Sequence, residues 1–421
     1  MKYNVCDFGA TADGKRCTKE IQAAIDACFL AGGGEVIVPG GTFLTGGLRI
    51  RSNVTLHLLK NAVLQGSVDP EDYTTYINDE IEPIPMEERD LPVATVKPGE
   101  KIGKSAYPYS RWNNAIIRAI KAKNIAIIGE KGSVIDGQNC FDEQGEEGYR
   151  GPHAINMWFC ENITLQGYTI RDSANWAHAI QNSKNISVNG ITVLGGHDGF
   201  DVRTCDNVVV ENSHITTGDD CIAGFDNINV VVRNCYFECA CSWFRFGATN
   251  MIAENCKGVS PGTYGFRGWL SDEDKRNRMP TTPACRHECH DIFLYYCDNR
   301  ATVRQTPGNI TIRNCEFINP ERIMNIPFGH IWCCNRSLHD ITFENCNISG
   351  LINPINLDCP EDEPLALLQM KNCTIGTMKG LEQIPFVQGK NVQKIVTENV
   401  TFTNFADPKI NIETATEIVN I

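Results

Sequence analysis

Two acidic clusters carry the residues best suited to acid–base chemistry. The first is His197-Asp198-Gly199-Phe200-Asp201 and the second is Thr217-Gly218-Asp219-Asp220-Cys221. If Asp198, Asp219 and Asp220 lie close together, their repulsion raises the pKa of at least one carboxyl, as a general acid requires. Each Asp could instead serve an Asx turn, or the three could bind Ca²⁺. For the cluster as a whole we favour catalysis.

A repeat surrounds these clusters. Strand-like runs begin at Asn162, Asn185, Asn207 and Asn229, in steps of 23, 22 and 22 residues. Short Val/Ile-rich runs, separated by residues that tolerate a left-handed backbone, are typical of a solenoid of β-strands. The Leu framework of a leucine-rich repeat is absent. The sequence therefore predicts an all-β, right-handed parallel β-helix.

This fold converts spacing in the sequence into proximity. Residues one repeat apart lie on neighbouring coils, about 4.8 Å apart along the axis. Asp198 and Asp219 are 21 residues apart, so we expect Asp198 and the Asp219-Asp220 pair on adjacent coils of one face.

Other segments complete the predicted single domain of residues 1–421. An apolar stripe at helical spacing predicts a capping helix over residues 18–31, with Thr18 as its N-cap. The irregular insertion 67–113 is rich in Pro and acidic residues and then basic and aromatic. We interpret it as a loop that walls one end of a groove; the alternative is a mobile surface excursion. The charged stretch 271–278 reads most simply as a solvated loop.

Composition limits the partners and the compartment. The 421 residues carry a formal net charge of −13, which disfavours nucleic acid. The start shows no signal peptide and no apolar run is long enough for a membrane span, so we expect a cytoplasmic protein, with extracellular origin left open for a trimmed chain. Several of the 20 cysteines follow Asn at repeat corners, where we expect small buried residues in a reducing compartment. The oligomeric state is left open.

The acidic clusters and the N-terminal motifs resemble glycoside hydrolase family 28, the polygalacturonases and rhamnogalacturonan hydrolases. The resemblance covers most of residues 1–270. It is carried by the following motifs: Gly195–Asp201, Thr217–Ala223, Asp7-Phe8-Gly9-Ala10, Pro39-Gly40-Gly41-Thr42-Phe43, Gln65-Gly66-Ser67 and Ile135-Asp136-Gly137-Gln138. The family usually has Gly after the last motif, whereas this chain has Asn139.

The resemblance implies inverting hydrolysis of an α-glycosidic bond in pectin-derived oligosaccharides. Residue by residue, Asp219 matches the general acid, and Asp198 and Asp220 match the pair that activates water. An inverting site needs carboxyls roughly 6.5–9.5 Å apart with room for that water. We expect exo action, with the 67–113 insertion blocking one end of the groove, and no cofactor.

Two departures alter the expected substrate recognition. Cys241-Ser242-Trp243 stands where polygalacturonases carry Gly-His-Gly, and Trp269 stands where they carry the Lys of Arg-Ile-Lys. The expected substrate-binding residues are therefore His197, Asp201, Trp243, Arg245, Arg267 and Trp269. Within this set Arg245 could replace the lost positive charge. A tryptophan offers a sugar a stacking face, although both tryptophans could simply pack between coils.

Three alternatives remain open. The missing His and Lys would suit a non-catalytic glycan-binding β-helix. A lyase or fructosyltransferase-type β-helix enzyme is the second rival. Cys285-Arg286-His287-Glu288-Cys289-His290 carries metal-capable side chains, but its spacing matches no standard zinc pattern.

Overall fold

The structure is a computed structural model that describes residues 1–74, 79–89, 91, 106–298, 302–327 and 336–420. The chain divides into two compact units. The first contains Met1–Asp201 and Arg267–Cys285, and the second contains Val202–Phe266 and Arg286–Ile421. The prediction of a single domain over residues 1–421 stays a prediction.

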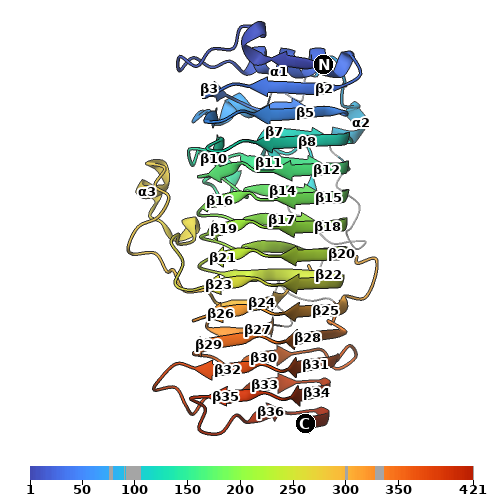
Figure 1. Cartoon of the computed structure of the whole chain (residues 1–421), viewed down its shortest axis with the longest axis vertical. Coiled ribbons are helices and arrows are strands. Elements are labelled where there is room, and N and C mark those ends of the chain that lie inside the picture. Colours follow the sequence, from blue (N-terminus) through green and yellow to red (C-terminus); the bar gives the residue numbers. More distant parts are fainter. Residues whose placement is uncertain (75–78, 90, 92–105, 299–301, 328–335, 421) are drawn as a thin grey trace. The chain divides into compact units, whose positions relative to one another are not determined.

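Parallel strands build the first unit, and each strand pairs with the strand one coil later (Figure 1). One ladder contains β1 (Lys2–Asn4), β2 (Gly34–Val38), β5 (Val54–Leu58), β8 (Lys123–Gly129), β12 (Glu161–Gln166) and β15 (Lys184–Asn189). A second contains β4 (Leu48–Ile50), β7 (Ala115–Ile120), β11 (His153–Trp158) and β14 (His178–Gln181). A third contains β3 (Gly41–Thr45), β6 (Ala62–Gly66), β9 (Val134–Asp136), β13 (Thr169–Arg171) and β16 (Thr192–Gly195).

The second unit follows the same plan. Its first ladder contains β18 (Asp206–Glu211), β20 (Ile222–Arg233), β22 (Ser242–Glu254), β25 (Gly308–Arg313), β28 (Asp340–Glu344), β31 (Leu365–Lys371), β34 (Val392–Glu398) and β37 (Ala415–Asn420). A second ladder begins with the N-terminal parts of β20 and β22. It then contains β24 (Asp291–Tyr295), β27 (Arg322–Pro327), β30 (Ile355–Asp358), β33 (Val387–Lys390) and β36 (Ile410–Ile412). The third ladder contains β19 (His214–Thr217), β21 (Tyr236–Glu238), β23 (Lys257–Val259), β26 (Glu316–Ile318), β29 (Asn347–Leu351), β32 (Thr374–Thr377) and β35 (Thr401–Thr403).

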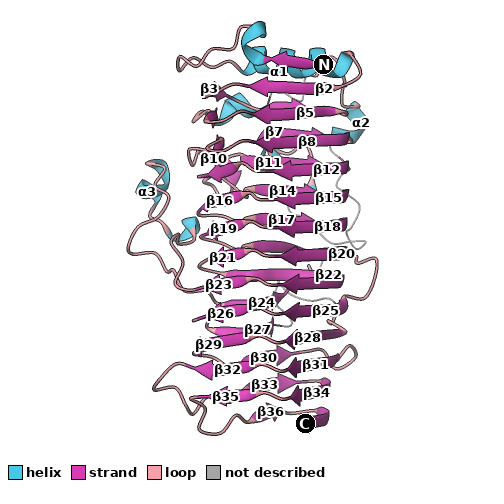
Figure 2. Ribbon diagram, in the orientation of Figure 1, coloured by secondary structure: helices cyan, strands magenta, loops and turns pink. Residues whose placement is uncertain are grey.

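These ladders confirm the predicted all-β, right-handed parallel β-helix, in which strands far outnumber helices (Figure 2). The residues that pair between neighbouring coils are separated by the predicted repeat length. Ile163 pairs with Ile186 in the first unit, and Val208 pairs with Val230 in the second.

The Asn residues that mark the repeat hold the corners. Asn185 and Asn229 have φ values of 58° and 59°, in the left-handed region, which Asn tolerates better than most residues. Each side chain donates to the Asn one coil earlier, Asn185 to Asn162 at 2.9 Å and Asn229 to Asn207 at 3.0 Å. The repeated Asn is therefore both a backbone requirement and a hydrogen-bonded ladder.

Buried cysteines form a comparable series in the second unit. The cysteines that follow Asn in the sequence are all buried: Cys235, Cys256, Cys315, Cys346 and Cys373. Their thiols lie within hydrogen-bond reach of backbone carbonyls, as Cys235 does to the carbonyl of Arg233 at 3.3 Å. Their predicted role as small interior side chains is confirmed. Cys333 and Cys334 lie outside the described residues.

Helix α1 (Thr18–Leu30) covers the first coil of the first unit, as predicted, and Ile21, Ala24, Ile25 and Cys28 face the interior. The predicted N-cap is wrong by one residue. Cys17 is the N-cap, and its side chain makes no capping bond. Thr18 does not cap the helix because its hydroxyl accepts a hydrogen bond from the amide of Gly46 at 2.7 Å.

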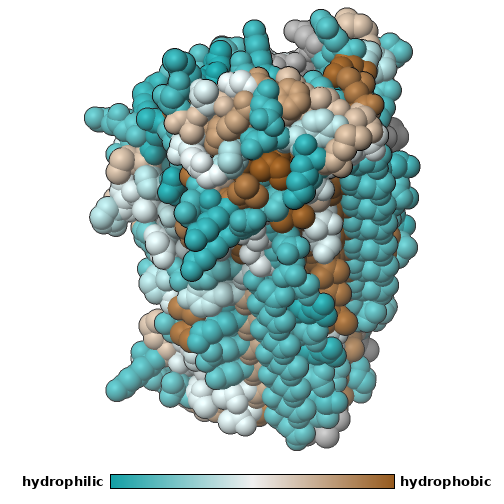
Figure 3. Space-filling view, turned by 45° about the horizontal axis from the view of Figure 1, so that its top comes forward, coloured by the Kyte–Doolittle hydropathy of each residue, from teal (hydrophilic) through white to brown (hydrophobic). Residues whose placement is uncertain are grey.

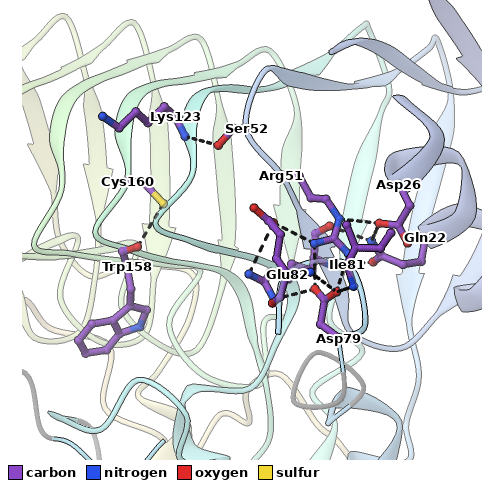
Figure 4. Close-up of polar contacts among 11 residues, drawn as sticks. Gln22, Asp26, Arg51, Ser52, Asp79, Ile81, Glu82, Lys123, Trp158 and Cys160 are labelled. Carbon is purple, nitrogen blue, oxygen red and sulfur yellow. Dashed lines mark hydrogen bonds and ion pairs between the residues drawn. The ribbon is translucent and has the colours of Figure 1, made fainter. Parts of the chain in front are cut away.

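Buried ion pairs anchor the described part of the 67–113 insertion to this capping helix (Figure 4). Arg51 binds Asp26 of α1 at 2.6 Å and Glu82 of the insertion at 2.9 Å. Arg49, in β4, binds Asp79 at 2.6 Å. The insertion also contains α2 (Met86–Arg89) and three-residue or four-residue 3₁₀ turns at Pro70–Tyr73 and Arg111–Asn113. The basic residues Lys101 and Lys104 lie outside the described residues, and the proposed wall of the groove stays a prediction.

The remaining elements are short. They are the 3₁₀ turns Val5–Phe8 and Arg267–Trp269, α3 (Asp272–Arg276), β10 (Phe141–Glu146) and β17 (Phe200–Arg203). Hydrophilic residues dominate the face drawn in Figure 3, and hydrophobic residues are exposed there only in small areas. Among the described residues no helix is long and apolar enough to cross a membrane.

Candidate active site

The Asp219-Asp220 pair lies in the turn between β19 and β20 of the second unit. The Thr217 hydroxyl donates to the backbone carbonyl of Asp219 at 2.9 Å, which fixes the start of the turn. The amide of Ser242, on the next coil, donates to Oδ1 of Asp220 at 2.8 Å. Asp219 is partly exposed, whereas Asp220 is 3% exposed. The turn therefore offers one carboxyl to solvent and holds the other inside.

Burial sets the protonation of this pair. Burial, and secondly the charge of Asp219, raises the pKa of Asp220 from 3.8 to about 7. Arg245 opposes the shift, with Nη1 at 3.6 Å from Oδ2 of Asp220. Near neutral pH the Asp220 carboxyl is therefore partly protonated.

The sequence interpretation missed the position of Cys241 beside Asp219. β20 and β22 pair with Ile222 opposite Phe244, which places Cys241 one coil after Asp219. Its thiol hydrogen-bonds the Asp219 carboxyl, and burial raises the pKa of the thiol well above its ordinary value. Cys241 therefore stays a neutral S–H donor. The 22-residue repeat was the signal that could have found it, because 219 and 241 differ by one repeat.

The guanidinium of Arg245 contacts an anion and an aromatic ring of the second unit. Besides Asp220, its guanidinium lies over the ring of Tyr296 at 3.9 Å from the centroid, a cation–π contact. The Arg245 side chain is 12% exposed. Its predicted contact with substrate stays a prediction.

Asp198 lies in the turn that follows β16, in the first unit. Two backbone hydrogen bonds from the preceding coil hold the turn. The amide of Ala177 donates to the carbonyl of Asp198 at 2.8 Å, and the amide of His178 donates to the carbonyl of Gly199 at 3.2 Å. Asp198 is 2% exposed. The prediction that Asp198 shares a pocket with Asp219 and Asp220 involves residues of both units and stays a prediction.

His197 is buried and neutral. Its ring stacks on Tyr149 with centroids 5.8 Å apart. Burial, and then the charges of Arg150 and Arg267, lower the pKa of His197 well below its ordinary value. Asp201 is likewise fully buried, and its predicted contact with substrate stays a prediction.

Arg267 is fully buried and holds the 267–285 segment in place. Its guanidinium donates to three backbone carbonyls, those of Asn139 at 3.2 Å, Lys275 at 3.0 Å and Met279 at 3.4 Å. Burial lowers the pKa of Arg267 to about 10, because removal from water destabilises the charged guanidinium.

The two tryptophans have different environments. Trp243 has no exposed surface and stacks on Phe317 at 5.2 Å. A Cβ at Gly258 would lie 2.7 Å from its ring, so this glycine makes room for the indole. The packing contradicts a sugar-stacking role for Trp243, because neither face is open. Trp269 is 43% exposed and keeps a surface for stacking.

The metal-capable run Cys285–His290 is used for packing where the structure describes it. In the second unit, Nδ1 of His287 lies 3.0 Å from the carbonyl of Gly262, and the thiol of Cys289 faces that of Cys239 at 3.9 Å.

Comparison with known proteins shows which family part of the chain resembles. The model of glycosyl hydrolases family 28 matches residues 94–240. A probable polygalacturonase of Vitis vinifera is 29% identical over 244 residues, which are 54% of this chain and 45% of the relative. An exo-poly-alpha-D-galacturonosidase of Dickeya chrysanthemi is 27% identical over 374 residues, 75% of this chain and 60% of the relative. Over residues 94–240 the chain is therefore similar to glycosyl hydrolases family 28.

Two solved structures of exopolygalacturonases share the fold. The family 28 exopolygalacturonase of Yersinia enterocolitica superposes with a TM-score of 0.66 at 18% identity, over 100% of this chain and 78% of that one. A hyperthermoactive exopolygalacturonase from Thermotoga maritima gives 0.68 at 16% identity, over 97% and 93%. The chain spans about half the length of the curated relatives, 45% and 60% for the two above.

Proposed function

We propose that this chain is an inverting glycoside hydrolase of family 28 that releases sugars from the end of pectin-derived oligosaccharides with galacturonosyl or rhamnogalacturonan-type linkages. The names of its relatives support the substrate class. The observation that carries the chemistry is the Asp219-Asp220 turn, where a partly exposed carboxyl adjoins a buried one with a raised pKa.

In this mechanism Asp219 is the general acid. Asp219 is the solvent-facing member of the pair, so a proton on its carboxyl can reach the oxygen of a scissile glycosidic bond. Asp220, ionised once the proton lies on Asp219, and Asp198 together orient and deprotonate the attacking water. The convergence of Asp198 with the pair rests on their separation of one repeat, since coils in each unit advance by 22 or 23 residues.

Water attacks the anomeric carbon from the face opposite the leaving oxygen. The C–O bond breaks, Asp219 gives its proton to the leaving oxygen, and the base pair takes a proton from the water. The products are two sugars, and the new reducing end has the inverted configuration. His197, Asp201, Trp269 and Arg245 are proposed to shape the sugar site.

Product analysis tests the proposal. The purified protein is incubated with galacturonate oligomers, and products are followed by mass spectrometry and by NMR of the first anomer formed. We expect monosaccharides or disaccharides, each one water heavier than the corresponding residue, with inverted configuration. Products that absorb in the ultraviolet would indicate a lyase, and binding with no product would indicate a glycan-binding protein. Random internal cuts would contradict exo action.

We also propose a cytoplasmic location. Within the described residues the cysteines are free thiols and form no disulfide, and Cys239 and Cys289 face each other as thiols. So many free thiols are typical of proteins in a reducing compartment. Fractionation of the producing cells, with a known cytoplasmic marker, tests this point.

A further inference from the structure

The imidazole of His178 contacts the turn that carries Asp198 from inside the first unit. His178 begins β14, one coil before this turn, and its side chain is fully buried. Nδ1 of its ring lies 3.0 Å from the carbonyl oxygen of Gly199, to which the His178 amide also donates at 3.2 Å. A carbonyl oxygen has two lone pairs. His178 therefore supplies a partner for each lone pair of the carbonyl that follows Asp198.

Two further contacts fix the orientation of the ring. Nε2 of His178 lies 3.0 Å from the hydroxyl oxygen of Tyr168, and Tyr168 is itself 1% exposed. One face of the imidazole stacks on Phe200, with centroids 4.1 Å apart and planes inclined by 6°. The ring is thus held at both nitrogens and at one face, and it contacts the two residues that follow Asp198 in the chain.

The hydrogen bonds allow one placement of the ring hydrogen. Burial lowers the pKa of His178 to about 3, so the imidazole is neutral near neutral pH and carries a single N–H. The Gly199 carbonyl can only accept, so the hydrogen lies on Nδ1. Nε2 then accepts from the Tyr168 hydroxyl. The donors therefore run in one direction, from Tyr168 through His178 to the turn.

A polar ring is not needed at this position for packing. The residue aligned with His178 on the preceding coil is Ile155, which is apolar and fully buried. Burying an imidazole costs free energy unless its nitrogens are hydrogen-bonded. The bond from Nδ1 is directed to the Asp198-Gly199 turn, so the polar ring serves that turn where an aliphatic side chain would fill the interior.

We propose that His178 is a positioning residue for Asp198 and that Tyr168 fixes the orientation of its ring. The inference rests on the proposed function, in which Asp198 helps to activate the attacking water. The Asp198 carbonyl is bonded to the Ala177 amide, and His178 holds the next peptide group, so the backbone on the C-terminal side of Asp198 is fixed. Such precision matters because a displacement of about 1 Å can lower a rate about 100-fold.

Two substitutions at His178 separate the hydrogen bond from packing. His178→Leu fills the space but cannot donate to Gly199. His178→Asn places an amide N–H near the position of Nδ1 and can still donate. Asn185→Ala is the matched control, because Asn185 lies at a corner of the same coil and donates to Asn162 at 2.9 Å. It lowers stability by loss of a hydrogen bond at a different place.

The experiment measures kcat and KM on a galacturonate trisaccharide, together with urea unfolding. We expect His178→Leu to lower kcat roughly 10–100-fold and to change KM less than about twofold, because positioning acts on the attack of water. His178→Asn should recover kcat to within about fivefold of wild type. Asn185→Ala should keep the wild-type kcat although its urea midpoint falls. Tyr168→Phe should lower kcat on the order of threefold to tenfold, and it tests the relay even if His178→Leu does not fold.

Crystal structures and nitrogen NMR of the imidazole give readouts that do not depend on activity. We expect the hydrogen on Nδ1 in wild type, and a displaced Asp198 carboxyl in His178→Leu or Tyr168→Phe but not in His178→Asn. A hydrogen on Nε2, or an Asp198 carboxyl that stays in place in both displaced-ring variants, would overturn the inference even where wild type hydrolyses the sugar.

The kinetic comparison gives a second decision. An equal loss of kcat in His178→Leu and Asn185→Ala would assign the effect to stability and overturn the inference. A displaced Asp198 carboxyl in a protein whose wild type releases no product would support the positioning of Asp198 by His178 and overturn the hydrolase proposal.

Discussion

Replacing Asp220 with Asn should stabilise the protein in a pH-dependent way. The side chain is buried, and its pKa rises from 3.8 to about 7 on folding. Above pH 3.8 the unfolded carboxyl ionises freely, whereas the folded one resists, so its ionisation opposes folding increasingly until about pH 7. That difference corresponds to a cost of about 4 kcal/mol at pH 8 and under about 1 kcal/mol at pH 4.

Asn has nearly the same shape and keeps an acceptor for the amide of Ser242. It also leaves Arg245 without its carboxylate at 3.6 Å, which offsets part of the gain, although the contact with Tyr296 remains. We therefore expect the free energy of unfolding to rise by about 2–4 kcal/mol at pH 8 and to change by less than about 1 kcal/mol at pH 4.

Urea unfolding of wild type and Asp220→Asn at both pH values measures this difference. Glu361→Gln, a change at an exposed carboxylate, is the control and should have little effect at either pH. A gain of equal size at pH 4 and pH 8, or a loss of stability at pH 8, would refute the reasoning that burial raises the pKa of Asp220.

Three further predictions concern the site and the coils. Cys241→Ala should lower kcat on the order of tenfold and shift the basic limb of its pH profile, because the thiol donor to Asp219 is lost; Cys241→Ser should retain most activity, and equal loss in both variants would count against the hydrogen bond. Trp243→Ala should reduce the free energy of unfolding by about 3–5 kcal/mol in urea titrations, since the indole is fully buried; a change below 1 kcal/mol would contradict its interior position. Asn229→Ala should cost about 1–3 kcal/mol in the same assay, because it removes ladder bonds and strains a left-handed residue, and Asn229→Gly should cost less.

Much of the fold could be predicted from the sequence because the repeat is both local and regular. Asn185 and Asn229 mark corners that need positive φ, and the short apolar runs between corners can only be buried by stacking on their neighbours. Register then follows from the period. The N-cap of α1 was misplaced because Thr18 bonds to the distant Gly46, a contact that no local pattern encodes.

The site was harder to predict because side-chain direction depends on tertiary packing. Trp243 looks like a sugar platform in the sequence, yet it packs against Phe317 in a space that Gly258 leaves open. Lys275 looks solvated within a charged stretch, yet it lies over Tyr149, more than a hundred residues away in the sequence. Such contacts join separate segments, and a single sequence carries no periodic signal for them.

The assignment of Asp219 as the general acid is tested most directly with Asp219→Asn on two substrates that differ in leaving group. On a galacturonate oligomer, whose leaving sugar needs protonation, we expect kcat/KM to fall by roughly 10²–10⁴. On α-galacturonosyl fluoride, whose leaving group needs little protonation, the variant should keep most of its activity, with unchanged unfolding. Full turnover of the oligomer by Asp219→Asn would contradict the assignment.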